Sequence, residues 1–159
     1  MSEVVAKLSL LGDREVVMET WFAAPCEQVF QAFIDPDAIP VWWGPEEYVT
    51  TVDKMDVQVG GRWRFVQRAP GGKKFAFNGA YRELDVPHKI VQTFEFEGLP
   101  GHIIRETMLF EVSDAGTKLI NTLLFDNQPD RDRMLRSGME QGARESMSRL
   151  DRWLQAKTE

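Results

Sequence analysis

The chain has 159 residues, of which 43% are hydrophobic and 28% charged, and its formal net charge is −6. This composition is typical of one globular domain, and we expect a single domain over residues 1–159 with its core at about 14–155. The acidic balance argues against a nucleic-acid partner, because such affinity depends on Lys and Arg neutralising phosphates. No apolar run reaches the roughly 18 residues of a membrane span, so no membrane insertion is expected.

Cysteine content and the N-terminal sequence indicate a cytoplasmic protein. Cys26 is the single cysteine and has no partner for an internal disulfide. The first 17 residues are interrupted by charges at Lys7 and Asp13 and lack the basic start and apolar centre of a signal peptide. We therefore expect a cytoplasmic location.

A strand and two short helices are predicted first along the chain. Residues 14–22 are rich in Val and aromatic residues and predict a strand. Asp35-Pro36 predicts the start of a second helix, which Pro40 should limit to about one turn. The first helix is predicted between the strand and Asp35-Pro36, because apolar residues there fall on one helical face. They are Cys26, Val29, Phe30 and Phe33.

A period of two residues then predicts six more strands, followed by one long helix. Gly- and Pro-rich turns separate the strands, as expected for an antiparallel meander, and about seven strands result. A continuous helix is predicted over residues 129–156, with an apolar stripe that includes Met139 and Leu150. The predicted strands lie near residues 48–57, 62–68, 75–84, 89–97, 103–113 and 117–126.

In an ordered set of motifs the chain resembles the family related to the C-terminal domain of the activator of the heat-shock-protein-90 ATPase. That family belongs to the START-like, or SRPBCC, helix-grip superfamily. The resemblance implies an α+β fold in which a curved antiparallel sheet of about seven strands grips a long C-terminal helix, with two short helices after the first strand. The motifs are FIDPDAIPVWWGP (33–45), VGGRWRFV (59–66), FNGAYREL (77–84), GTKLI (116–120) and ESMSRLDRWL (145–154).

Such a fold implies a cavity between the sheet, the C-terminal helix and the two short helices. Strand alternation places aromatic residues and Met together on single faces, which the family pattern turns toward the cavity. Plain core packing is the competing interpretation for each of them. The expected lining residues are Phe33, Trp42, Trp43, Trp63, Phe65, Phe77, Phe94, Phe96, Glu106, Met108, Phe110, Asn121 and Met139.

Glu106 and Asn121 are the polar members of this set, each on an otherwise apolar strand face. Buried polar groups need a partner or a function, so the two either orient a ligand or make structural hydrogen bonds. A buried Glu would have a raised pKa and would be able to act as an acid or base. His88 and His102 lack the spacing of a metal site. No catalytic set, metal site or cofactor is expected.

Trp42 and Trp43 stand side by side before the turn dipeptide Gly44-Pro45. We expect one ring to pack under the short helices as core and the other to line the pocket or its entrance. The alternative is that both rings close the end of the curved sheet.

Three functions remain open at this point. The first is binding of a small hydrophobic or aromatic molecule by a domain without catalytic activity. The second is an enzyme, such as a cyclase, aromatase or hydrolase, that uses the same cavity. The third is a co-chaperone-like module that contacts a chaperone and stimulates its ATPase. The eukaryotic activators carry an additional N-terminal domain, for which we expect no room in these 159 residues. A homodimer is compatible with all three.

Overall fold

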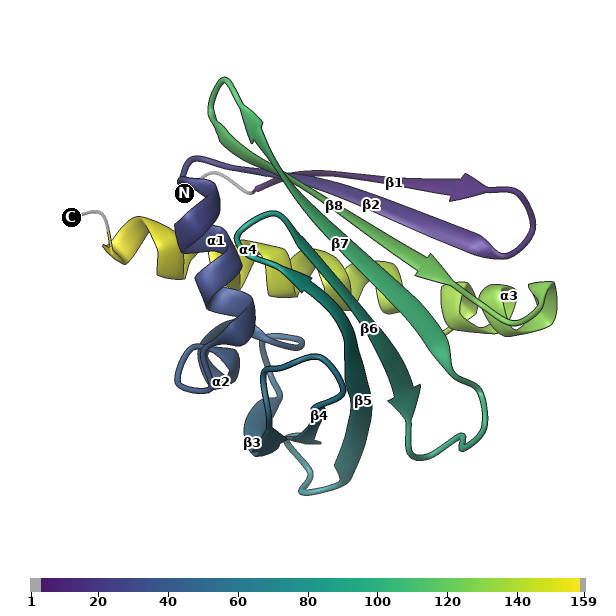
Figure 1. Cartoon of the computed structure of the whole chain (residues 1–159). Helices are drawn as coiled ribbons and strands as arrows, with labels where there is room; N and C mark the ends of the chain where they lie inside the picture. The colour runs from purple at the N-terminus through teal and green to yellow at the C-terminus, as the bar shows by residue number, and fades with distance from the viewer. Residues whose placement is uncertain (1–3, 158–159) are drawn as a thin grey trace.

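A computed structural model describes residues 4–157 and contains one curved antiparallel sheet gripping a long helix (Figure 1). The strands run in the order β1-β2-β8-β7-β6-β5-β4-β3, and every neighbouring pair is antiparallel. Their bounds are β1 Val5–Leu11, β2 Glu15–Phe22, β3 Val49–Met55, β4 Arg62–Arg68, β5 Lys74–Asp85, β6 Lys89–Phe96, β7 Ile104–Ser113 and β8 Gly116–Leu124.

The seven expected strands are all present, but the sheet has an eighth, β1, which the sequence pattern did not predict. β1 lies at the edge of the sheet and pairs with β2 from Val5↔Trp21 to Leu11↔Glu15. None of the β1 side chains is fully buried. The alternation of apolar and polar residues that identifies a half-buried strand in a sequence is therefore weak in β1. The outermost ends of the predicted domain, residues 1–3 and 158–159, lie outside the part of the chain that is described.

Four helices complete the fold: α1 Cys26–Ile34, α2 Ile39–Trp42, α3 Gln128–Arg136 and α4 Met139–Lys157. α1 and α2 lie at one end of α4, whereas α3 extends beyond the other end (Figure 1). α4 crosses the sheet and buries Met147, Leu150 and Leu154 in the same core as Trp63 and Phe65. No helix within residues 4–157 combines the length and the hydropathy of a membrane span.

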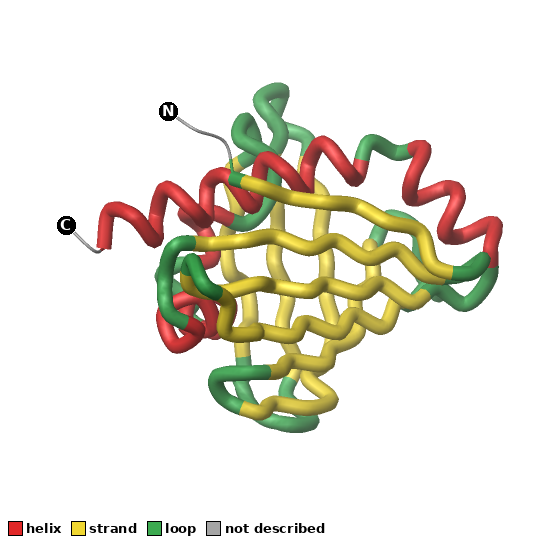
Figure 2. Tube along the Cα trace, turned by 90° about the horizontal axis from the view of Figure 1, so that it is seen from above, coloured by secondary structure: helices red, strands yellow, loops and turns green. Residues whose placement is uncertain are grey.

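The predicted continuous C-terminal helix is wrong, because the chain breaks at Ser137 and Gly138. Gly138 has φ +86°, a left-handed conformation that cannot continue an α-helix and that glycine adopts most readily. Figure 2 shows the two helical segments separated by this short connection. α3 begins with its own cap, since the Asn127 side chain accepts a hydrogen bond from the Asp130 backbone N–H.

The second helix is about one turn long, as predicted, but its predicted start is wrong. The Asp35 carboxylate accepts a hydrogen bond of 2.8 Å from the Asp37 N–H, as a helix N-cap does, but residues 36–38 form a turn that precedes the helix. α2 begins only at Ile39, so Pro40 lies in its first turn, where the missing N–H costs little.

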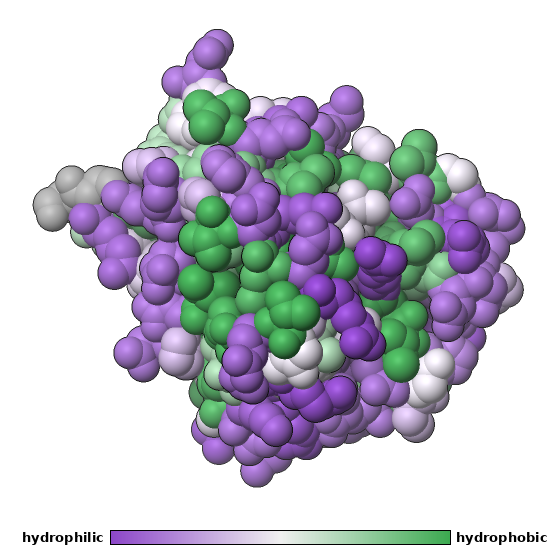
Figure 3. All heavy atoms as spheres, in the orientation of Figure 1, coloured by the Kyte–Doolittle hydropathy of each residue, from purple (hydrophilic) through white to green (hydrophobic). Residues whose placement is uncertain are grey.

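The core consists of two apolar clusters on the inward face of the sheet. The larger lies under α1, α2 and α4, and the smaller lies at the α3 end around Val16, Ile104 and Phe125. Leu8 and Phe94 pack against both clusters and therefore connect them. On the face shown in Figure 3, hydrophilic side chains surround separate apolar areas.

Candidate functional site

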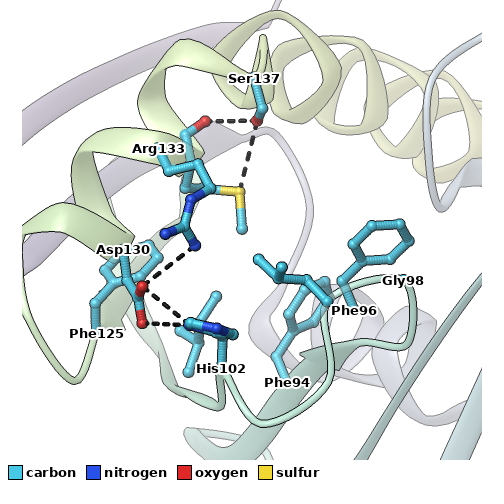
Figure 4. A pocket seen from close by; sticks show the side chains of 11 residues that line it. Phe94, Phe96, Gly98, His102, Phe125, Asp130, Arg133 and Ser137 are labelled. Carbon is cyan, nitrogen blue, oxygen red and sulfur yellow. Dashed lines mark hydrogen bonds and ion pairs between the residues drawn. The ribbon is translucent and has the colours of Figure 1, made fainter.

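A pocket of about 290 Å³ lies at the α3 end of the sheet, beside the smaller core cluster (Figure 4). β6, the β6–β7 loop, β7, the residue after β8, and α3 with its C-terminal end contribute to its wall. Most of its residues are apolar, and the polar ones gather on the α3 side. The lining residues are Phe94, Phe96, Gly98, Leu99, His102, Ile104, Phe125, Asp130, Arg133, Met134 and Ser137.

The apolar wall is built on β6, where alternation turns Phe94 and Phe96 to the same face. Both rings pack against Phe77 of β5, with centroid distances of 5.5 and 5.3 Å. Gly98 lets the Phe96 ring approach the loop closely, because a Cβ on Gly98 would lie 2.4 Å from that ring. This wall is therefore held by aromatic packing and does not depend on an occupant.

The polar edge of the pocket is a cluster of three side chains from the β6–β7 loop and α3. The His102 Nδ1 lies 2.9 Å from Asp130 Oδ2, and Arg133 Nη1 donates to Asp130 Oδ1 at 3.3 Å (Figure 4). The hydrogen bond from His102 is the main cause of a lowered Asp130 pKa, and Arg133 lowers it further. Asp130 is consequently a carboxylate near neutral pH, and it fixes the His102 ring through Nδ1.

Deeper on the same face lies a second polar cluster, in which Glu106 receives two hydrogen bonds. Gln92 Nε2 donates to one carboxylate oxygen at 2.8 Å, and Asn121 Nδ2 donates to the other at 3.0 Å. Gln92 and Glu106 stand two residues from Phe94 and Ile104 on their strands, and thus on the same face as the pocket wall. The structure brings Glu106 and Asn121 together, although neither lines the pocket beside α3.

Burial raises the pKa of Glu106, and the hydrogen bonds from Asn121 and Gln92 oppose that effect only in part. The side chain retains some accessible area, and desolvation is nevertheless the largest influence on the pKa of its carboxyl. Asn121 Oδ1 is buried and has no hydrogen-bond partner within residues 4–157. This cluster therefore holds a carboxyl of raised pKa beside an unsatisfied acceptor.

The two adjacent tryptophans have different surroundings. Trp42 is 2% exposed, and its Nε1 donates to the Ala32 carbonyl of α1 at 3.0 Å. Trp43 is half-buried and packs edge-on against Phe65 and Phe77, with centroid distances of 5.1 and 5.4 Å. Trp42 is thus a core residue, and neither ring lines the pocket beside α3.

Of the residues expected to line a cavity, Phe94 and Phe96 also line this pocket. Met139 packs against the smaller core cluster next to it. The remaining apolar residues belong to the larger core cluster or pack against it. They are Phe33, Trp42, Trp43, Trp63, Phe65, Phe77, Met108 and Phe110.

Sequence reasoning missed the polar edge formed by His102, Asp130 and Arg133. The predicted helix start at residue 129 already places Asp130 in the first turn of a helix, as observed for α3. No local signal links Asp130 with His102, because 28 positions separate them. Within residues 4–157 no group of three or more His, Cys, Asp or Glu is placed to hold a metal ion.

The sequence matches the family model described as "Activator of Hsp90 ATPase homolog 1-like protein" over residues 23–155. Among solved structures, protein Ms6760 from Mycobacterium smegmatis is 23% identical with a TM-score of 0.86, over 95% of this chain and 96% of that one. Protein CV1439 from Chromobacterium violaceum is 28% identical with a TM-score of 0.77, over 88% and 96%.

The AHSA1 protein from Silicibacter pomeroyi is 22% identical with a TM-score of 0.74, over 90% of this chain and 99% of that one. No match was found among the curated proteins. The family match covers most of the chain, and the fold it implies, a curved sheet around a C-terminal helix, is the fold observed. The chain therefore belongs to the activator of Hsp90 ATPase homolog 1-like family, in the START-like, or SRPBCC, helix-grip superfamily.

Proposed function

We propose that this domain binds a small hydrophobic or aromatic molecule, with the apolar part of the ligand in the pocket beside α3. The observation that carries the proposal is the pocket of about 290 Å³ with its prepacked wall of Phe94 and Phe96. Ligand sites are typically concave, mostly apolar and roughly 300–1,000 Å³ in volume. The pocket volume lies just below that range, which favours a ligand of one or two rings.

The polar cluster deeper in the sheet supports a binding space that continues between the sheet and α4. Glu106 keeps accessible area although burial dominates its pKa, as expected for a side chain that faces an internal space. Asn121 Oδ1 lacks a partner, so a hydroxyl or N–H group of a ligand would find an acceptor nearby. In this proposal Glu106 and Asn121 orient the deeper end of the ligand.

An enzyme is the second candidate, and the observation that favours it is the raised pKa of Glu106 on an inward face. A carboxyl whose pKa is raised by burial is able to give or take a proton, as a cyclase or aromatase requires. A chaperone role draws its support from the family description alone.

For a domain with one buried cysteine we retain a cytoplasmic location as a prediction.

Fluorescence titration with the neutral aromatic probe N-phenyl-1-naphthylamine tests the proposed site. Leu99 lies in the pocket wall and is 37% exposed, so Leu99→Trp would fill the pocket without disturbing the core. We expect wild-type protein to bind the probe, and Leu99→Trp to weaken binding by about tenfold or more, which corresponds to roughly 1.4 kcal/mol.

Val59→Trp is the matched control, because Val59 is 65% exposed in the β3–β4 loop and does not line the pocket. This variant should bind the probe like the wild type. Absence of probe binding by the wild type, or equal loss in both variants, would remove the pocket from the proposal. Direct excitation of the probe avoids interference from the added indole.

A further inference from the structure

The polar edge of the pocket beside α3 has more basic than acidic side chains. His102 and Arg133 are basic and Asp130 is the single acid among the lining residues, whereas the whole chain has 25 Asp and Glu against 19 Lys and Arg and 2 His. We infer, on the basis of the proposed function, that the ligand is an aromatic or hydrophobic acid. Its anionic group meets His102 and Arg133, and its apolar body lies against Phe94 and Phe125.

Arg133 keeps donors available after its contact with Asp130, and His102 offers Nε2 as a second donor when its ring carries both protons. His102 uses Nδ1, and its Nε2 has no hydrogen bond to any residue from 4 to 157. Arg133 uses Nη1, which leaves its Nε and Nη2 without protein partners in the same part of the chain. A guanidinium carries five N–H donors in a planar fork that matches the two oxygens of a carboxylate.

Asp130 acts as a positioning residue and does not repel the ligand anion. Its carboxylate accepts hydrogen bonds from His102, Arg133 and the Asn127 Nδ2, the last at 3.5 Å, so its charge is already paired. Its backbone N–H is bound to the Asn127 side chain at 2.8 Å, which fixes its place in the first turn of α3. The carboxylate thus orients the two basic groups along one edge (Figure 4).

The arrangement disfavours a purely apolar occupant of the whole pocket. Such a ligand would cover the remaining donors of Arg133 and the Nε2 of His102 without replacing their hydrogen bonds to water, which costs free energy. An anionic group at the edge keeps these donors satisfied, while Phe96, Leu99 and Met134 contact the apolar body. The pocket therefore fits an amphipathic molecule with its acid at the α3 side.

Two probes with the same ring system separate this inference from the proposed function. The first, 8-anilinonaphthalene-1-sulfonate, is an aromatic anion, and N-phenyl-1-naphthylamine lacks its sulfonate. Wild-type protein should bind the anionic probe more tightly than the neutral one, and the preference should shrink as salt is added. Arg133→Met and His102→Gln should each lower affinity for the anionic probe by about five- to tenfold, with little change for the neutral probe.

Arg136→Met is the matched control, because Arg136 is an exposed residue of the same helix and does not line the pocket. It should leave both affinities unchanged. If both probes bind equally to the wild type and to every variant, the inference is wrong and the proposed function stands. If neither probe binds the wild type, the proposed function fails as well. Retained neutral-probe binding shows that each variant is folded.

Discussion

Glu106 and Asn121 come from adjacent strands and share a hydrogen bond of 3.0 Å on the inward face of the sheet. Asn121 Nδ2 donates to the carboxylate, whereas Asn121 Oδ1 has no partner among residues 4–157. The pair therefore stabilises the charged form of Glu106 while burial opposes it, and burial prevails. This balance makes the pair a source of pH-dependent stability.

The first prediction concerns the pH dependence of folding. Because the folded-state pKa of Glu106 is raised above its ordinary 4.5, the folded state binds this proton more tightly than the unfolded chain. The contribution of Glu106 to the free energy of unfolding is then largest below pH 4.5 and falls as the pH rises toward the raised pKa. Urea unfolding of wild type and Glu106→Gln at about pH 5 and about pH 8 measures it.

The stability of the wild type relative to Glu106→Gln should be greater at the lower pH. Gln fits the site, because a rotated Asn121 amide would present Oδ1 to the new N–H₂ group. Glu111→Gln, on the exposed side of the same strand, reports the effect of losing a carboxyl that faces solvent. An equal difference between wild type and Glu106→Gln at both pH values would contradict the assignment.

The second prediction separates Trp42 from Trp43. Pro36 stands four residues after Ala32 and has no N–H, so α1 cannot supply the usual partner for the Ala32 carbonyl. Trp42 Nε1 takes that place inside the core. Trp42→Phe should therefore lower the free energy of unfolding by about 2–4 kcal/mol, through a lost hydrogen bond and a cavity.

Trp43→Phe provides the comparison, since Trp43 is half-buried and its aromatic contacts to Phe65 and Phe77 survive in part. Its cost should be about 1 kcal/mol. Chemical denaturation of both variants gives the two values. Equal destabilisation would show that the hydrogen bond to Ala32 does not distinguish the two rings.

The sequence predicted most strands because Gly and Pro turns mark their ends and alternation marks their faces. It also identified Glu106 and Asn121, since each interrupts an apolar face that strand alternation makes visible. The break in the C-terminal helix was hidden, because Leu135 and Met139 keep helical spacing across Gly138. The His102–Asp130 contact joins a loop to a helix across 28 positions, and such tertiary contacts leave no local pattern.

The third prediction concerns the helix cap that positions the polar edge of the pocket. Asn127 is the N-cap of α3, and its side chain accepts the Asp130 N–H at 2.8 Å. Asn127→Ala should destabilise the protein by about 1 kcal/mol, whereas Asn127→Ser should retain most of the stability. Thermal unfolding measures both changes, and equal melting temperatures for the two variants would argue against the cap.

The fourth prediction tests the connection between α3 and α4. Gly138 has φ +86°, and a Cβ there would meet no heavy atom within 4 Å. Gly138→Ala should therefore cost only the backbone strain of the left-handed conformation, about 1–2 kcal/mol, with no steric contribution. Gly138→Asn should cost less, because Asn adopts this conformation more readily than Ala.

Gly79 provides the contrasting case, since a Cβ there would lie 1.8 Å from the Thr93 carbonyl oxygen and 2.7 Å from Trp63 Nε1. Gly79→Ala must displace strand backbone and should destabilise the protein more than Gly138→Ala does. Urea unfolding of the three glycine variants gives the order. If Gly138→Ala is as stable as the wild type, the left-handed turn is not required there, and the chain can join α3 and α4 into the continuous helix that the sequence pattern favours.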